Sequence, residues 1–587
     1  MDVFIIIKCL GGIAIFLFGM DQMGKYLEKL SGGKLEGVLG KLTSNRFSAV
    51  IFGALVTAIL QSSTTTSVMV VGLVNSGIMK LSQAVGVLMG ANIGTTITSW
   101  ILSLAGVGEG ASTVLKLFKP SSLAGILGFV GILLKMVSKK EQRKDVGTIL
   151  LGFSLLMFGM TTMTEAVSPL AEKPEVAGLL VKFSNPLLGV LAGLVLTVLV
   201  QSSATSIGIL QAFCISGAVT YSIAIPIIMG QNIGTCFKAM ISSVGATKNA
   251  KRASFVHLYF NLLGTVLFLT AFYVLYGIFK WEFVAEKASA ANIALIHSMF
   301  NIGTTVVLFP FGKLIEKLAV ISVPEKKTVK EENREFSLLD TRFLDTPSFA
   351  VEQCKAVTLQ MANISRAAMI TAIELLTHYD PAKANRVEEL ESQADVYEDE
   401  LGAYLVKVAN KRLSAKDSNA VTKILHCIGD FERISDHALN IKQVAEEMMT
   451  KELSFSSNAQ KEIEVYTRAV TDIINETIEA FATENIGVAR KIEPLEQVID
   501  GLNKSIKTRH IDRLCKGECT IEMGFILTDL MGNYERVSDH CSNIAVAVIQ
   551  MQTDIEGAHK YLGDIKSGED KIFTDEYKVD AQKYALP

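Results

Sequence analysis

Residues 61–67 read QSSTTTS, seven hydrogen-bonding side chains in succession. Apolar runs flank them, FSAVIFGALVTAIL before and VMVVGLV after. A polar stretch inside an apolar segment of this length is costly in a membrane unless something polar is bound there. A second stretch at 201–206, QSSATS, repeats the pattern. The pair predicts a membrane domain with a polar binding site built from two similar segments.

The recurrence extends beyond these two stretches at one constant spacing. Three motifs return after 140 positions: FGM at 18 and 158, QSS at 61 and 201, and GxNIGT at 90 and 230. Three ordered matches at one spacing indicate an internal duplication. The membrane domain is therefore expected to consist of two repeats.

Charge divides the chain into two unlike parts. Up to residue 321 there are 24 Lys and Arg against 13 Asp and Glu, and from 322 onward 32 against 46. Only the first part has apolar runs long enough to span a bilayer. The expected boundaries are a membrane domain over 1–321, with repeats at about 3–136 and 146–280 and a final helix at about 290–320, a linker over 322–347, a helical soluble domain over 348–552 and a tail over 553–587.

The basic loops indicate how the repeats are oriented. The loop after the first helix, the junction at 135–144 and the segment at 247–252 are rich in Lys and Arg, whereas the loop after Met160 is not. Short basic loops are typically cytoplasmic. We expect two inverted repeats, as in many secondary transporters, with the N-terminus outside and the soluble domain in the cytosol. The QSS segments are either broken helices or re-entrant hairpins.

The surroundings of the polar stretches restrict their chemistry. The Asn-Ile-Gly-Thr elements at 92–95 and 232–235 disfavour a continuous helix, so we expect breaks there that free backbone N–H and C=O groups. Between 47 and 105 the only charged side chain is Lys80, and between 183 and 237 there is none. A dianion in such a site needs counter-charge, and the hydroxyls and carbonyls suit Na⁺.

We therefore expect sodium-coupled uptake of an anion. The alternative is that the hydroxyls only bond helix to helix. Trp100 and Trp281 are expected at the membrane interface, and the pairs His257/Asn261 and His297/Asn301 are expected to bond between helices. The candidate substrate and sodium residues are Gln61, Ser62, Ser63, Thr64, Thr65, Asn92 and Thr95 in the first repeat, and Gln201, Ser202, Ser203, Thr205, Asn232 and Thr235 in the second.

Duplicated QSS motifs with NIGT elements resemble the type II sodium/phosphate cotransporter family over roughly residues 1–320. The resemblance implies a secondary active symporter that imports inorganic phosphate with Na⁺ by alternating access. Carried over by position, both QSS triplets would line the phosphate and sodium sites. Many members have a third Ser, where this chain has Thr64 and Ala204. Thr205 can supply the hydroxyl that Ala204 lacks.

The soluble part is also duplicated. DFERISDHALNI, which includes Asp430, returns as NYERVSDHCSNI at 533–544. Two three-helix bundles with acidic seams are expected, since carboxylates four apart share one helix face. The pattern resembles the PhoU family, which implies divalent or iron ions at the carboxylates; salt bridges with Arg433 or Arg536 are the alternative. The candidate metal ligands are Glu391, Asp395, Glu432, Asp436, Glu496, Asp500, Glu535 and Asp539.

The motifs favour a transporter and not an enzyme. We find no nucleophile–base motif, dinucleotide fingerprint or P-loop, so an ATP-driven pump is not expected. Two alternatives remain open: a membrane-tethered phosphate-signalling regulator with little transport, and a symporter of another oxyanion such as sulfate or arsenate. The expected partners are inorganic phosphate, Na⁺ and the lipid bilayer of the cell (inner) membrane, without nucleic acid. The oligomeric state is left open, with a homodimer as one alternative.

Overall fold

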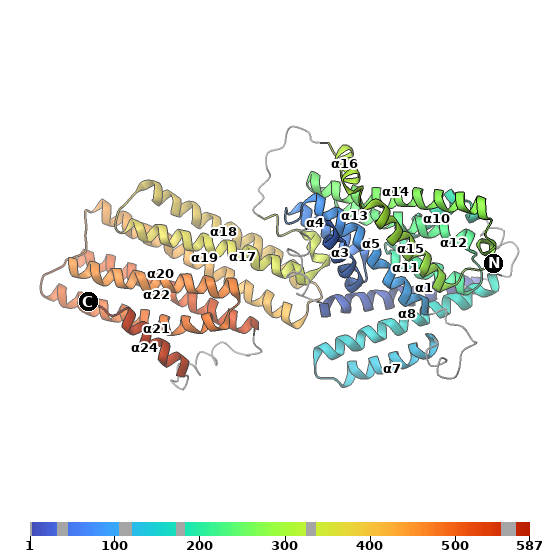
Figure 1. The fold of residues 1–587 in the computed structure, drawn as a ribbon. Coiled ribbons are helices and arrows are strands. Elements are labelled where there is room, and N and C mark those ends of the chain that lie inside the picture. Colours follow the sequence, from blue (N-terminus) through green and yellow to red (C-terminus); the bar gives the residue numbers. More distant parts are fainter. Residues whose placement is uncertain (1–2, 32–44, 105–119, 172–181, 325–335, 553–570) are drawn as a thin grey trace. The chain divides into compact units, whose positions relative to one another are not determined.

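The computed structural model of the chain describes residues 3–31, 45–104, 120–171, 182–324, 336–552 and 571–587. It divides into two compact units, Met1–Phe349 and Ala350–Pro587. The described residues form helices and contain no strand, only one isolated bridge between Thr220 and Lys287 (Figure 1). The predicted all-α class is confirmed.

The first unit repeats its helices at the spacing seen in the sequence. The first helix of each polar segment has 15 residues and the second has 13, and the ends of each pair lie 140 positions apart. The helices are α1 Val3–Ser31, α3 Arg46–Leu60, α4 Ser63–Asn75, α5 Leu81–Ser103, α7 Pro120–Val137 and α8 Glu141–Ala171, then α10 Pro186–Val200, α11 Ser203–Ile215, α12 Tyr221–Gly234, α13 Cys236–Ser242, α14 Lys248–Phe279, α15 Ala290–Leu308 and α16 Gly312–Ser322.

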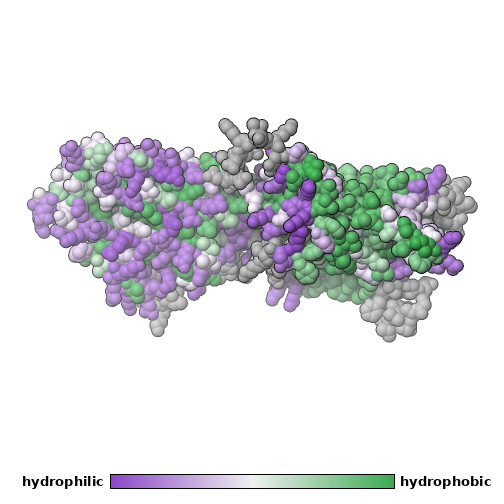
Figure 2. All heavy atoms as spheres, turned by 45° about the horizontal axis from the view of Figure 1, so that its top comes forward, coloured by the Kyte–Doolittle hydropathy of each residue, from purple (hydrophilic) through white to green (hydrophobic). Residues whose placement is uncertain are grey.

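The surface of the first unit is suited to a bilayer. Five of its described helices are long and apolar enough to cross a membrane: α1, α5, α8, α14 and α15. Figure 2 shows apolar residues gathered over this unit, and large side chains such as Leu187 and Leu199 are more than three-quarters exposed. Apolar patches of this extent are rare on soluble monomers.

The last membrane segment differs from the prediction. A single helix was expected over about 290–320, but α15 ends at Leu308 and α16 begins at Gly312. Pro310 lies between them. Proline lacks the N–H that a continuing helix needs and its ring clashes with the preceding turn, which explains the break.

Part of the expected linker packs firmly on the first unit, while residues 325–335 lie outside the described part. The short helix η4, Thr341–Asp345, places Phe343 in full burial. Its ring lies against Gly72 of α4, where an added Cβ would come within 2.7 Å of a ring carbon. Asp340 accepts a hydrogen bond from Asn75 at 2.7 Å. Residues 336–346 therefore pack on α4, the second helix of the first polar segment, through Phe343 and Asp340.

The second unit consists of two three-helix bundles, as predicted. They are α17 Pro347–Leu375, α18 Pro381–Ala409 and α19 Ala415–Thr450, and α20 Ser457–Thr483, α21 Ile486–Cys515 and α22 Ile521–Gln552. Of the predicted tail, residues 553–570 lie outside the described part. The remainder forms α24, Lys571–Lys583, which packs on α21, followed by buried Tyr584, which donates a hydrogen bond to Asp472.

Candidate functional site

Each QSS stretch forms the tip between two short helices. Gln61 ends α3 in the left-handed conformation with φ 52°, and Gln201 ends α10 with φ 58°. The next residue caps the following helix: Ser62 Oγ accepts from Thr65 N at 3.1 Å, and Ser202 Oγ from Thr205 N at 3.3 Å. The left-handed residue reverses the chain and the serine satisfies one of the free N–H groups of the new helix.

The two helices of each segment fold back on one another. Thr57 Oγ1 donates to Thr66 Oγ1 at 2.9 Å, and Thr197 Oγ1 donates to Ser206 Oγ at 2.9 Å. Residues nine apart in one straight helix would be separated by about 13 Å. Each helix is also shorter than the roughly 20 residues needed to span a bilayer. Of the two structures considered, the hairpin is therefore the one the geometry favours over a broken spanning helix.

The two hairpin tips meet. Ser63 Oγ and Ser203 Oγ share a hydrogen bond at 3.2 Å, and both side chains are buried. These residues occupy the same position in the two repeats, 140 apart. Contact between equivalent residues is expected where a pseudo-two-fold axis passes between the copies. The segments far apart in sequence are thus joined at the polar residues themselves.

The remaining hydroxyls of the tips bond locally. Thr65 Oγ1 and Ser62 Oγ are 2.9 Å apart, and Thr205 Oγ1 donates to Ser202 Oγ at 2.9 Å. Thr205 thus has the same role as Thr65. Thr64 is buried, and its counterpart Ala204 offers no hydroxyl.

The prediction of helix breaks at the NIGT elements is wrong for the first copy. Asn92 and Thr95 lie inside the continuous helix α5 and bond to carbonyls of their own helix, those of Leu88 and Ala91. In the second copy Asn232 lies within α12, and Thr235 stands between α12 and α13. The glycine of each element serves close packing instead: a Cβ on Gly94 would lie 2.5 Å from Ala54 O, and one on Gly234 would lie 2.7 Å from the Cβ of Thr197.

The glutamines of the two tips differ. Gln61 Oε1 accepts from Thr98 Oγ1 at 2.8 Å, and its amide nitrogen donates to Ala58 O. Gln201 is exposed, and the residue equivalent to Thr98 in its repeat is Lys238. Lys238 is half-buried and lies in α13, just beyond the uncharged stretch noted in the sequence. The position whose hydroxyl holds the Gln61 amide therefore has a cation as its equivalent in the second repeat.

Sequence reasoning missed several of these partners. The residues not selected were Thr57, Thr66, Thr98, Thr197 and Ser206. The spacing of 140 could have identified them, since each is a polar residue with an equivalent in the other repeat at the same distance from a QSS triplet.

Backbone dipoles supply the electrostatics of the meeting point. Helices α4 and α11 begin at Ser63 and Ser203, which touch, so two helix N-termini with their first free N–H groups lie together. Such N-termini favour an anion. The preceding helices α3 and α10 end at Leu60 and Val200, and their last carbonyls, with the nearby hydroxyls, are oxygen ligands that suit a hard cation.

The His/Asn pairs of α14 and α15 are wholly buried. Asn261 Nδ2 donates to Cys236 Sγ at 3.3 Å, a contact between helices as expected. Asn301 Nδ2 bonds only to His297 O of its own helix. Within the described residues, both ring nitrogens of His257 and of His297 have no protein partner. Buried groups of this kind are usually satisfied by water or a bound species.

The second unit brings three candidate metal ligands together. One carboxylate oxygen from each of Glu391, Asp395 and Asp436 lies within 4.8 Å of the others. Burial and the neighbouring Asp436 raise the pKa of Glu432 to about 7. Burial and the same neighbour also raise the pKa of Asp395. Arg433 contacts Asp436 at 3.2 Å, so the ion pair and the acidic cluster coexist.

The second acidic seam is less concentrated. Within the described residues, Glu496, Asp500, Glu535 and Asp539 supply no trio of oxygens as close as that of the first seam. Asn503 donates to Glu535. Burial, Asp500 and Glu535 raise the pKa of Asp539.

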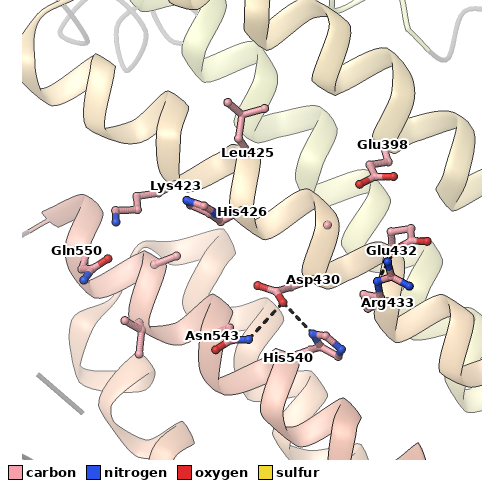
Figure 3. Close-up of a pocket in the computed structure, with 13 residues that line it drawn as sticks. Glu398, Lys423, Leu425, His426, Asp430, Glu432, Arg433, His540, Asn543 and Gln550 are labelled. Atoms are coloured by element: carbon pink, nitrogen blue, oxygen red, sulfur yellow. Dashed lines mark hydrogen bonds and ion pairs between the residues drawn. The ribbon is translucent and has the colours of Figure 1, made fainter. Parts of the chain in front are cut away.

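A paired His network joins α19 to α22. His540 Nδ1 lies 2.8 Å from Asp430 Oδ1, and Asn543 donates to the same oxygen, at the edge of a cavity of about 670 Å³ (Figure 3). The equivalent contact on the other side joins His437 Nδ1 to Asn533 Oδ1 at 2.8 Å. One histidine thus meets a carboxylate and the other a neutral amide.

Both units of the chain match known protein families. Residues 15–165 and 155–303 match the family described as Na⁺/Pi-cotransporter, and 358–445 and 464–548 match the PhoU domain. The chain is 21% identical over 562 residues to the "Putative inorganic phosphate export protein YjbB" of Escherichia coli (strain K12), covering 95% of this chain and 99% of that protein. It is 29% identical over 321 residues to the "Uncharacterized protein YqeW" of Bacillus subtilis (strain 168), covering 54% of this chain and 97% of that one.

Two further similarities are shorter. The chain is 35% identical over 103 residues to sodium-dependent phosphate transport protein 2A of Rattus norvegicus, covering 17% of this chain and 16% of that protein. Among solved structures, PhoU from Pseudomonas aeruginosa matches with a TM-score of 0.33 and 21% identity, covering 35% of this chain and 97% of that one.

Proposed function

Because this chain belongs to the Na⁺/Pi-cotransporter family and carries a PhoU domain, we propose that it is a symporter of inorganic phosphate and Na⁺. The family is one of transporters, not of enzymes, and membership assigns phosphate transport in a membrane. Na⁺ coupling, direction and the site residues are our proposal. The single observation that carries it is the contact of Ser63 with Ser203.

Anion and cation have separate ligands at this meeting point. The paired N-termini of α4 and α11, with the hydroxyls of Ser63, Thr64 and Ser203, would hold phosphate. The carbonyl ends of α3 and α10, with hydroxyls such as Thr65 and Thr205, would hold Na⁺. The four hairpin helices contain no carboxylate. Bound Na⁺ therefore supplies counter-charge that the protein lacks.

Alternating access follows from two hairpins with equivalent tips. If the repeats are inverted, as the loop charges predict, each hairpin would close one side of the membrane over the shared site. Movement of one relative to the other would then expose the site to each side in turn. Gln61 and Gln201, which end the first helix of each hairpin, would both contact the ligands of this shared site.

Direction follows from the gradients. An inward Na⁺ gradient drives a symporter inward, which favours uptake. The E. coli relative is named for phosphate export, and the same carrier runs outward when phosphate is more concentrated inside than the Na⁺ gradient can support. Uptake and efflux from vesicles loaded with phosphate, measured in parallel, separate a reversible symporter from an exporter that ignores Na⁺.

The PhoU domain would regulate transport from the cytosol. The chain enters it directly after residues 336–346, which are seated on α4 through Phe343 and Asp340. A displacement of this segment would reach the helix that starts at Ser63. Glu391, Asp395 and Asp436, with Glu432 beside them, would bind a divalent or iron ion, and the second seam would do so more weakly.

Flux measurements with purified protein in liposomes test the proposal. Ser63→Ala and Ser203→Ala should each lower Na⁺-driven uptake of labelled phosphate by about tenfold or more, because each removes a hydrogen bond to a charged ligand. Thr162→Val is the control, since that hydroxyl lies on α8, outside both hairpins, and donates to Phe158 O of its own helix.

Three results would contradict parts of this proposal. Uptake that is equal with K⁺ in place of Na⁺ would exclude coupling. Normal uptake in both serine variants would exclude the site. Absence of flux from folded wild-type protein would favour the membrane-tethered regulator instead. Competition by sulfate or arsenate in the same assay identifies the oxyanion.

A further inference from the structure

A cavity of about 510 Å³ lies between α12, α14 and α15 and shares no lining residue with the hairpin tips. Five aromatic rings and six aliphatic or Met side chains line it. Its polar groups are the Tyr221 hydroxyl, the Trp281 N–H, Glu286 and Asn292. The composition is that of a site for an apolar molecule with one polar end.

The cavity opens on the surface that faces lipid. Leu275, Leu295 and Met299 line it and are each 41–57% exposed. They continue the exposed apolar faces of α14 and α15, which include Val274 and Ile278. Both helices are long and apolar enough to cross a membrane. A molecule from the bilayer can therefore enter without passing through water.

The polar end combines aromatic faces with a carboxylate. Trp281 lies 5.8 Å from Phe283 and 6.2 Å from Phe272, and Tyr221 lies 5.8 Å from Phe283, between ring centroids. Glu286 also lines this cavity, and within the described residues it forms no ion pair. The Tyr221 hydroxyl oxygen already accepts from Asn292 Nδ2 at 2.6 Å and from Ser289 N at 3.4 Å, which leaves Glu286 as the acceptor for a cation. Aromatic faces beside an unpaired carboxylate favour an organic cation.

The position of the cavity at the end of a membrane-spanning helix agrees with a site for an apolar molecule with a charged end. The cavity lies at the end of α14, where the helix stops at Phe279 and the segment KWEFVAEK, 280–287, follows. Charged residues and Trp281 at a helix end are typical of the level of lipid headgroups. The apolar walls would then accept an acyl chain and the 281–286 segment its headgroup.

We propose that this cavity binds a phospholipid whose headgroup has a primary ammonium, of the phosphatidylethanolamine type. A primary ammonium offers three N–H donors to the Glu286 carboxylate, whereas a quaternary ammonium offers none. The aromatic rings attract either cation, so Glu286 is the group that selects between them. The lipid would also contact Tyr221 and Ile225 in the first turns of α12, the helix that contains Asn232.

Native mass spectrometry of the full purified chain tests the site. Phosphatidylethanolamine, phosphatidylcholine and phosphatidylglycerol with identical acyl chains are added singly at equal concentration. Wild-type protein should retain the ethanolamine lipid about tenfold better than either other lipid, as expected for one charge-assisted hydrogen bond. Glu286→Gln should abolish this preference.

The matched control is Glu282→Gln, which removes a carboxylate of the same exposed segment that does not line the cavity. It should behave as wild type. Equal retention of all three lipids by wild-type protein, or an unchanged preference in Glu286→Gln, would overturn the proposal. The comparison of lipids on wild-type protein decides the question even if the Glu286 variant does not fold.

Discussion

At the scale of single residues, the two glutamines combine a strained backbone with a functional side chain. Gln61 and Gln201 have positive φ, which costs an L-residue roughly 1 kcal/mol that glycine does not incur. Strain of this kind often persists where the side chain is needed. The side chain of Gln61 is held by Thr98, which fixes its orientation at the tip.

Gln61→Gly should therefore lower transport much more than stability. The variant removes the strain, worth roughly 1 kcal/mol, but also the hydrogen bonds to Thr98 and Ala58 O, so the free energy of unfolding should change by no more than about 1 kcal/mol. It also removes the amide, so Na⁺-driven uptake should fall by about tenfold or more. Glu452→Gly is the control, because Glu452 has φ 51° in the second unit and is exposed. That control should keep full uptake, and loss of uptake in both variants would contradict a specific role for Gln61.

At the scale of elements, glycines set the distance between the hairpins and their neighbours. Gly53 and Gly90 hold α3 against α5, and Gly193 and Gly230 hold α10 against α12, with carbonyls 1.9–2.0 Å from where a Cβ would stand. A methyl group there cannot be accommodated without moving backbone, which costs about 1–3 kcal/mol or more.

We expect Gly90→Ala and Gly230→Ala to lower both thermal stability and uptake, since each pushes a hairpin away from its partner helix. Gly303→Ala, on α15, is the matched control because nothing lies within 4 Å of its added Cβ. Melting by circular dichroism, with uptake by the same preparations, measures both effects. Equal melting temperatures for all three variants would show that the packing is looser than the structure indicates.

The sequence predicted which helices correspond between the two repeats better than it predicted where a helix is continuous and where the chain reverses. The spacing of 140 correctly predicted the duplicated helices, and both family resemblances are confirmed. The NIGT glycines were interpreted as helix breaks, because glycine is common both in breaks and in close helix contacts, and only a neighbouring helix distinguishes them. The hairpin turn stayed undecided because apolar periodicity does not record whether a chain reverses after a break.

Phe343 lies where the sequence pattern predicts only a linker. Phe343→Ala should cost about 3–5 kcal/mol of local stability, because it leaves a cavity against Gly72. Trypsin should then cleave after Arg342 faster than in wild type, since Arg342 is held by Ser242 O and Asp340. Phe311→Ala, at an exposed position, should leave the cleavage rate unchanged. Equal rates in all three proteins would mean that residues 336–346 are not held by this ring.

At the scale of the whole molecule, the two units differ in how they distribute negative charge. The first unit avoids carboxylates at its polar centre and would import its counter-charge as Na⁺. The second concentrates carboxylates in seams: burial and Asp436 raise the pKa of Glu432 to about 7, and burial and Asp395 raise the pKa of Glu391. Na⁺ would supply counter-charge to an anion bound in the first unit, and a metal ion would relieve the repulsion between carboxylates in the second.

The stability of the second unit should consequently depend on pH and metal together. A carboxyl group whose pKa is higher in the folded than in the unfolded state binds more protons when folded, so its contribution is present at low pH and is lost as pH rises through about 7. Glu432 is partly exposed, so solvent screening reduces the effect to about 1 kcal/mol, or roughly 2–4 °C in melting temperature. In chelator, the unit should melt lower at pH 8 than at pH 5.5, and a divalent cation should reverse the loss.

Calorimetry of the full chain measures this, with Glu432→Gln as the test variant and Glu400→Gln, an exposed carboxylate of α18, as the control. In chelator, Glu432→Gln should lose less melting temperature between pH 5.5 and pH 8 than wild type, because one of the carboxyl groups with a raised pKa is gone, while Glu400→Gln should follow wild type. Adding Mn²⁺ or Fe²⁺ at pH 8 should raise the melting temperature of wild type more than that of Asp436→Asn, which replaces one of the three converging carboxylates with a neutral amide. A melting temperature that rises with pH in chelator would mean that the carboxyl groups of this seam do not repel one another in the folded state. Equal stabilisation of Asp436→Asn by metal would show that the ion binds elsewhere.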